Sequence, residues 1–134
     1  MNIENGLGTI KINNTLYAKV IYQAVSLTDN EMFMSAATPK ILATKDRKGS
    51  TTFLSQNIEV TETDDEIDIV FYVIAKFGTS ISKNAGLILQ NVIEDLSYAF
   101  PNHSIHVKMK VIGVKSKNIA RRDLEFVTSY EPER

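Results

Sequence analysis

The sequence contains no cysteine among its 134 residues. This absence excludes disulfide bonds, thiolate metal sites and thiol catalysis, and it is compatible with a reducing cytosol. Long hydrophobic runs are also missing, because the longest, Ile69 to Ala75, has seven residues, whereas a membrane-spanning helix needs about 20. The opening "MNIENGLG" has neither the basic region nor the apolar core of a signal peptide. We therefore expect a cytoplasmic protein without direct membrane insertion.

An excess of charge of one sign is missing as well. The formal net charge is -1 and charged residues make up 23% of the chain, so no global field attracts the protein to nucleic acid or to an acidic membrane. Hydrophobic residues make up 43%, which is enough for the core of one domain of this length. We expect a single domain over residues 1–134, with a core at about 8–115 and a C-terminal segment, 116–134, that is either docked or loose.

Two segments near the start carry different periodicities. In "GTIKIN", Ile10 and Ile12 alternate with polar residues, which predicts a short first strand. The next stretch, "NNTLYAKVIYQAVSL", predicts a helix over about residues 15–27, capped by Asn13 or Asn14. The apolar stripe of this helix consists of Leu16, Val20, Ala24 and Leu27, widened by Tyr17, Ile21 and Val25.

The region of residues 28–56 has no strong periodicity, and Pro39 argues against a continuous helix there. Residues 41–55 could form two strands joined by a basic turn. The pattern returns in "NIEVTETDDEIDIVFYVIAKF", which predicts a hairpin. Its second strand is apolar on both faces, so we expect it at the centre of the sheet, ending in the core at Phe77. The apolar positions of its first face are Ile67, Ile69, Phe71, Val73, Ala75 and Phe77.

A second helix is predicted after Gly78, with Ser80 or Ser82 as its cap and Pro101 beyond its end. Its apolar face consists of Ile81, Ala85, Ile88, Val92, Leu96 and Ala99. The stretch "SIHVKMKVIGV" then alternates, which predicts a half-buried strand. The order strand, helix, strands, helix, strand predicts an α+β fold: a two-layer sandwich with two helices on one face of a mixed sheet of four or five strands.

No catalytic, cofactor-binding or metal-binding residue can be assigned. Gly78 lies between a strand and a helix, as in a phosphate-binding loop, but it lacks the further glycines or the Gly-Lys ending of such loops, so we interpret it as a turn. The carboxylates of "TETDDEID" lack the glycine of a calcium loop and should lie in a solvated turn. His103 and His106 point to opposite faces of a strand that begins at Ser104, so they cannot share a metal.

Two groups of residues form a candidate interaction surface. Val70, Tyr72 and Ile74 make the second face of the central strand apolar, and we expect the C-terminal segment or another subunit to cover it. Lys108 and Lys110 share a strand face and could bind phosphate, RNA or anionic lipid. No aromatic residues interleave with these lysines in the sequence, so a solvated face is the simpler interpretation.

Three motifs in order resemble the alkaline shock protein family, the Gls-type general stress or envelope stress response proteins of Gram-positive bacteria. "GTIKINNTLYAKVIYQAV" is similar to the opening of that family, a Gly-x-Ile-x-Ile strand, a polar cap and a helix. "IDIVFYVIAKFGTSISKNAGLILQNVIEDL" is similar to its strand, aromatic-Gly turn and helix, and "IHVKMKVIGV" to its closing strand. The Gly-Val segment that often follows the first helix is absent from "VSLTDNEMFMS".

The resemblance implies a non-catalytic protein of the envelope or alkaline stress response that forms homo-oligomers. In some members a small integral-membrane anchor protein holds such a protein at the membrane. The residues themselves leave two other functions open. One is a small nucleic-acid- or ribosome-associated binding module, motivated by the α+β pattern and the lysines, although the net charge makes nucleic acid a less favoured partner. The other is an enzyme with a phosphorylated substrate at the Gly78 turn.

Overall fold

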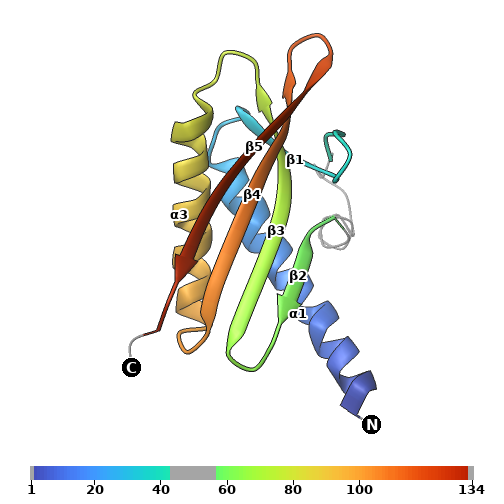
Figure 1. Ribbon diagram of the computed structural model, residues 1–134, viewed down its shortest axis with the longest axis vertical. Helices are drawn as coiled ribbons and strands as arrows, with labels where there is room; N and C mark the ends of the chain where they lie inside the picture. The colour runs from blue at the N-terminus through green and yellow to red at the C-terminus, as the bar shows by residue number, and fades with distance from the viewer. Residues whose placement is uncertain (1, 43–56, 133–134) are drawn as a thin grey trace.

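The computed structural model describes residues 2–42 and 57–132, with side chains of the first helix from Asn14 onward. The elements are α1 (Asn2–Ser26), β1 (Met32–Ser35), β2 (Glu59–Glu62), β3 (Glu66–Lys76), α3 (Ile81–Ala99), β4 (Ser104–Lys115) and β5 (Ile119–Tyr130). Both helices lie behind one mixed, five-stranded sheet (Figure 1). The predicted α+β fold, a sandwich of two helices on a mixed sheet, is confirmed.

Strand β3 is the centre of the sheet. One edge of β3 pairs antiparallel with two short strands. Strand β1 pairs with the C-terminal part of β3, and β2 pairs with the N-terminal part of β3. The other edge pairs in parallel with β4 along its whole length, and β5 adds to β4 in antiparallel orientation. The hairpin of β2 and β3 and the central place of β3 are therefore as predicted.

The core lies between the sheet and the two helices. Odd-numbered side chains of β3 from Ile67 to Ala75 point to the helices and are at most 1% exposed. The parallel register sets the alternate apolar residues of β4 beside them, namely Ile105, Val107, Met109 and Val111. Helix α3 covers these strands with Ala85, Ile88, Val92 and Leu96, so its predicted apolar face is largely confirmed, with Ala99 exposed at its end. Each large side chain buried in this way contributes about 1.5–3 kcal/mol.

The prediction of a first strand at Ile10 and Ile12 is wrong. Both residues belong to α1, which runs without interruption from residue 2 to residue 26, so Asn13 and Asn14 lie inside the helix and do not cap it. Four alternating residues are too few to distinguish the strand period of two from the helical period of 3.6. The preceding letters "IENGLGTI" place apolar residues four and three positions apart, as a helix does.

The buried stripe of α1 is shifted by one position from the main stripe that the sequence suggests. Tyr17 and Ile21 are fully buried, whereas Leu16 is 38% and Leu27 is 56% exposed. The contacts of Tyr17 explain this rotation: its ring centroid lies 5.8 Å from that of Phe100 at the end of α3, and its hydroxyl donates to Glu62 Oε1 at 3.0 Å. The seven apolar residues of this helix form a broad stripe, so the sequence is compatible with two rotations of the helix about its axis. Tyr17 reaches its partners in only one of them.

The segment beyond residue 115, which the sequence leaves open between docked and loose, forms the edge strand β5. In the described part of the region of residues 28–56, which ends at residue 42, the structure contains the short strand β1. The two strands suggested for residues 41–55 lie outside the described residues except at their first two positions, where Ile41 forms an isolated bridge with Ser35.

The Gly78 turn connects β3 to α3 as the sequence suggests. Gly78 has a φ of +88°, a conformation that a side chain disfavours, and Ser80 caps α3 by accepting the Lys83 amide. The prediction that Phe77 ends the strand in the core is wrong, because β3 ends at Lys76 and Phe77 is 71% exposed. Its amide donates to the Lys115 carbonyl at 2.9 Å, but its ring lies past the last paired row of the sheet.

Two glycine-to-alanine substitutions should have opposite effects on the free energy of unfolding. Gly78→Ala should lower it by about 1–2 kcal/mol because an L residue is strained at this positive φ. Gly86→Ala should raise it by about 0.5–1 kcal/mol, because Gly86 lies inside α3 with open space where the alanine methyl group would lie. Urea denaturation measures both, and a shift of the same sign in the two variants would contradict the turn geometry.

Candidate interaction surface

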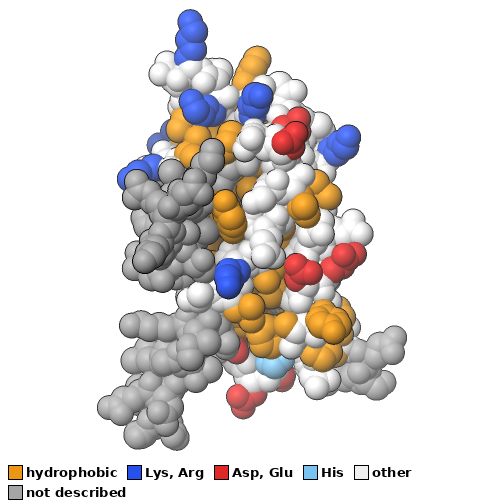
Figure 2. Space-filling view, turned by 180° about the vertical axis from the view of Figure 1, so that it is seen from behind, with side chains coloured by type: hydrophobic (Ala, Val, Ile, Leu, Met, Phe, Trp, Pro, Cys, Tyr) orange, Lys and Arg blue, Asp and Glu red, His pale blue; other side chains and the backbone are white. Residues whose placement is uncertain are grey.

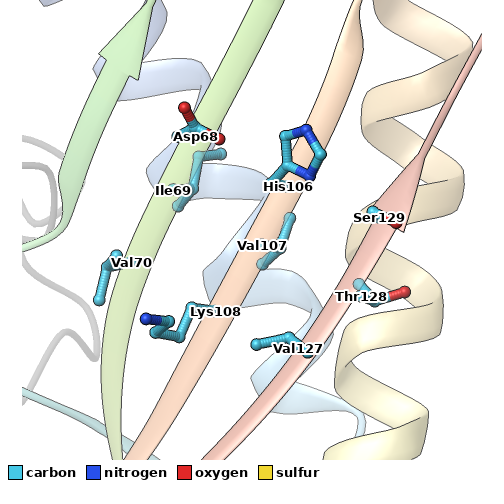
Figure 3. A pocket seen from close by; sticks show the side chains of 9 residues that line it. All are labelled: Asp68, Ile69, Val70, His106, Val107, Lys108, Val127, Thr128 and Ser129. Atoms are coloured by element: carbon cyan, nitrogen blue, oxygen red, sulfur yellow. The ribbon is translucent and has the colours of Figure 1, made fainter.

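The face of the sheet that points away from α1 and α3 is here termed the open face. The strand register places Val70 between Glu59 of β2 and Lys108 of β4, with Val127 of β5 opposite Lys108. The adjacent row across the same strands consists of Asp68, His106 and Ser129. Val70, Lys108 and Val127 of the first row and all three residues of the second line a shallow groove of about 540 Å³, termed the open groove (Figure 3).

All five residues of the predicted surface lie on the open face, because the register pairs Val70 with Lys108 and Tyr72 with Lys110, and Ile74 follows on the same side of β3. They differ in how far a partner can reach them. Ile74 is fully buried and Tyr72 is 9% exposed, whereas Val70, Lys108 and Lys110 are partly exposed. A partner on this face would therefore meet Val70 and the two lysines.

Ile74 is covered by the start of β5. Both ladders of β4 shift register at Ile112, and the next residue, Gly113, lies opposite Ile74. A Cβ atom on Gly113 would stand 2.8 Å from Ile119 Cγ2 and 3.4 Å from Ile74 Cγ1, so the two isoleucine side chains converge over the glycine. From the sequence we expect the C-terminal segment or another subunit to cover Val70, Tyr72 and Ile74. The C-terminal segment covers the Ile74 end of this group.

Tyr72 is held by a carboxylate. Its hydroxyl donates to Glu59 Oε2, and this hydrogen bond, together with burial and the negative charge of Glu59, raises the pKa of Tyr72 to about 12. On the helix side, burial and the carboxylate of Glu62 raise the pKa of Tyr17 as well. Each pair ties β2 to another element, Glu59 to β3 and Glu62 to α1, so both tyrosine hydroxyls serve the fold.

The free energy of unfolding should fall as the pH rises from about 10 to about 12. In this window Tyr72 of the unfolded chain loses its proton while the folded chain keeps it, so deprotonation favours the unfolded state. The loss assigned to Tyr72 should be at most about 2 kcal/mol. Urea denaturation across this range, compared with Tyr72→Phe, measures it. An equally steep decline in the variant would contradict the role of the hydroxyl.

The positive stripe on β4 is partly neutralised. Lys108 Nζ lies 3.9 Å and Lys110 Nζ lies 3.6 Å from the two carboxylate oxygens of Glu125 on β5. His106 Nε2 lies 3.7 Å from Glu131. Exposed pairs of this kind contribute little stability, but they weaken the attraction of this stripe for a phosphate backbone. The open face therefore presents both signs of charge around Val70 and Val127.

Val127 is the surface residue that sequence reasoning missed. It is 68% exposed and lies across the open groove from Val70 (Figure 3). The period of two would have placed it there, since Glu125, Val127 and Ser129 alternate with Phe126 and Thr128, if the C-terminal segment had been recognised as a strand.

The helix side of the molecule also exposes hydrophobic side chains. Seen from behind the sheet, hydrophobic side chains are interspersed with charged ones (Figure 2). The large exposed ones on the two helices are Leu16, Tyr22, Leu87 and Tyr98, and Leu27 follows the end of α1.

The two histidines have different surroundings. The His103 ring packs edge-on against Phe100 at 5.6 Å, whereas His106 lies on the open face. Asp64 and Asp65 are exposed in the β2–β3 turn. Within residues 2–42 and 57–132, no group of three or more histidines and carboxylates is arranged to hold a metal ion. No helix in the same ranges is long and apolar enough to cross a membrane.

The fold and the open face define a two-layer α+β protein with an exposed, mixed-charge surface on its sheet. The model of the alkaline shock protein 23 family, described as having a cell envelope-related function, matches residues 2–116. The chain belongs to this family, in agreement with the three motifs of the sequence. No curated protein and no solved structure matches the chain.

Proposed function

We propose that this protein acts without catalysis in the envelope or alkaline stress response, by self-association and by binding protein partners near the membrane. The family match supports the connection with the cell envelope. The observation that carries the rest is the open groove, where Val127 is 68% exposed in a lining that also contains the charged side chains of Asp68 and Lys108. An exposed apolar residue in a groove with a polar rim is typical of a protein interface.

A second copy of the chain is the occupant that suits the open face. Lys108 and Lys110 lie on the same face as Asp68 and Glu125, so the surface carries both signs of charge within a short distance. A two-fold interface uses the same patch on both copies, and such a patch must be complementary to itself. Val70 and Val127 would form its apolar centre.

A non-catalytic role is supported by how the buried polar side chains are used. The Ser104 hydroxyl donates to Glu131 at 2.7 Å, and the Thr28 hydroxyl donates to the Val25 carbonyl at 2.7 Å. The Asn84 amide donates to Glu31 at 2.9 Å, joining α3 to the start of β1. The Ser104 and Asn84 side chains each tie two segments of the chain together, and the Thr28 hydroxyl, which also accepts the Met32 amide at 3.1 Å, fixes the turn between α1 and β1.

The site of action that we propose is the cytoplasmic face of the membrane, where a small integral-membrane anchor protein would hold the oligomer. The sequence supports this location through its lack of cysteine. The anchor protein and the second copy need separate surfaces, because the open face would be occupied in the oligomer.

Val127→Glu should shift the oligomer towards monomer by at least about tenfold in the dissociation constant, because it places a charge at the centre of the interface. Sedimentation velocity over a range of concentrations measures the shift. Tyr98→Glu is the matched control, since Tyr98 is 90% exposed on the helix side. Circular dichroism should show both variants folded.

Two results would contradict self-association through the open face. One is a wild-type protein that stays strictly monomeric at high concentration. The other is an equal loss of oligomer in the Val127 and Tyr98 variants. In cells, absence of the protein from the membrane fraction would contradict the proposed anchor.

A further inference from the structure

The end of the sheet at the Gly78 turn combines an exposed aromatic ring with lysines. Phe77 is 71% exposed there, and it lines a groove of about 460 Å³ together with Phe33. The same groove is lined by Lys76 and Lys115, with Asn30 and Ser116 completing its wall. Thus the structure brings two aromatic residues beside two lysines, a combination that is not visible in the sequence.

Lys76 and Lys115 lie directly opposite each other in the parallel ladder of β3 and β4. Like charges in this position destabilise a sheet. In the described part of the chain neither lysine forms an ion pair, in contrast to Lys108 and Lys110, which share Glu125. A bound anion would relieve this repulsion, so the pair favours an anionic ligand.

Charge is distributed unequally between the two ends of the molecule. The end with Phe77, termed the basic end, also carries Lys83 in the first turn of α3 and Lys117 in the β4–β5 turn (Figure 1). Two acidic residues lie at the same end, Asp29 and Glu31, whose backbone carbonyl accepts the Lys76 amide, so the four lysines outnumber the carboxylates there. The N-terminus of α3 adds the positive end of a helix dipole. The opposite end carries the acidic β2–β3 turn with Asp64 and Asp65, the first residue of β3, Glu66, and, after β5, Glu131. An anionic surface would orient such a molecule with its basic end towards the surface.

We propose that the basic end docks directly on an anionic lipid bilayer. The Phe77 ring enters the headgroup region, and a lipid phosphate lies between Lys76 and Lys115. An aromatic ring inserted at the interface and lysines near anionic lipids are the two contributions on which peripheral membrane binding depends. The contact involves side chains at the tip of a turn and needs no spanning segment.

A bilayer fits these residues better than single-stranded nucleic acid. Nucleic-acid channels place aromatic rings at intervals along a groove so that successive bases stack. Here both rings, Phe33 and Phe77, belong to one groove at the end of the molecule, and the family has a cell envelope-related function. The inference goes beyond the proposed function, which requires protein partners only.

Vesicle co-sedimentation at low ionic strength tests this docking. The full-length protein is mixed with vesicles of phosphatidylcholine alone or with equal parts of phosphatidylglycerol, and binding should require phosphatidylglycerol. The double variant Lys76→Gln/Lys115→Gln should weaken binding about 25-fold, at about fivefold per lysine. Phe77→Ser should weaken it about tenfold, because the ring no longer enters the interface.

Two matched controls separate this end from the rest of the surface. Lys19→Gln removes an exposed lysine of α1 that belongs neither to the open face nor to the groove at Phe77, and Tyr98→Ser removes an aromatic ring that is 90% exposed on α3. Both should change binding less than about twofold. Equal losses in the control and test variants would overturn the assignment to the basic end.

Two further outcomes would overturn the inference. One is no binding to phosphatidylglycerol vesicles at low salt. The other is binding to a single-stranded RNA oligomer, but not to vesicles, that the Lys76/Lys115 variant loses, which would assign the basic end to nucleic acid. Two measurements distinguish vesicle binding from self-association. Sedimentation velocity should show that Phe77→Ser still forms the oligomer. Val127→Glu, which loses the oligomer, should still bind vesicles detectably.

Discussion

The parallel pairing of β3 with β4 is the constraint on which the rest of the structure depends. A parallel pair needs a crossover connection, and α3 supplies it while covering the pair. Since β3 is hydrogen-bonded along both edges, its register decides which side chains face the helices. A slip by one residue would turn Ile67, Phe71 and the other buried side chains of its odd face to the open face. The apolar odd face of β3 therefore fixes the register of its neighbours.

One extra residue in β4 shapes both ends of the candidate surface. Val73 pairs with Val111, but beyond the bulge at Ile112 the pairing is Ile74 with Gly113. Without the bulge, Lys76 would lie opposite Val114; with it, Lys76 lies opposite Lys115. The same shift places a glycine beneath Ile119, which lets that side chain close over Ile74. The apolar residues of the open face are therefore covered near the basic end, at Ile74. Accessible apolar surface remains at Val70 and Val127.

Elements with long, regular patterns could be predicted from the sequence, and elements that depend on distant partners could not. The two-sided apolar pattern of β3 persists over seven residues and the helical spacing from Ile81 to Leu96 over sixteen, so both patterns are long enough to identify their elements. Strand β5 was missed because it is an edge strand with exposed Arg121, Arg122 and Asp123, which leaves little apolar alternation to detect. For the candidate site, the period of two predicted one shared face for Val70, Tyr72 and Ile74 and one for Lys108 and Lys110, and the parallel register of the folded chain joins the two groups. How far a partner can reach Tyr72 depends on Glu59, and how far it can reach Ile74 depends on Ile119. The positions of Glu59 and Ile119 are defined only in the folded chain.

The open face and the basic end constrain each other geometrically. The basic end lies at one end of the strands, and the open face extends along them (Figure 1). If the basic end contacts a bilayer, the open face is therefore roughly perpendicular to the membrane. Two copies joined through their open faces would both reach the membrane only if their two-fold axis runs along the strands. An axis across the strands would instead bring each basic end near the acidic β2–β3 turn of the other copy, an arrangement that charge favours in water. An anionic bilayer screens the repulsion between two adjacent basic ends, and it therefore favours the arrangement in which both copies touch the membrane.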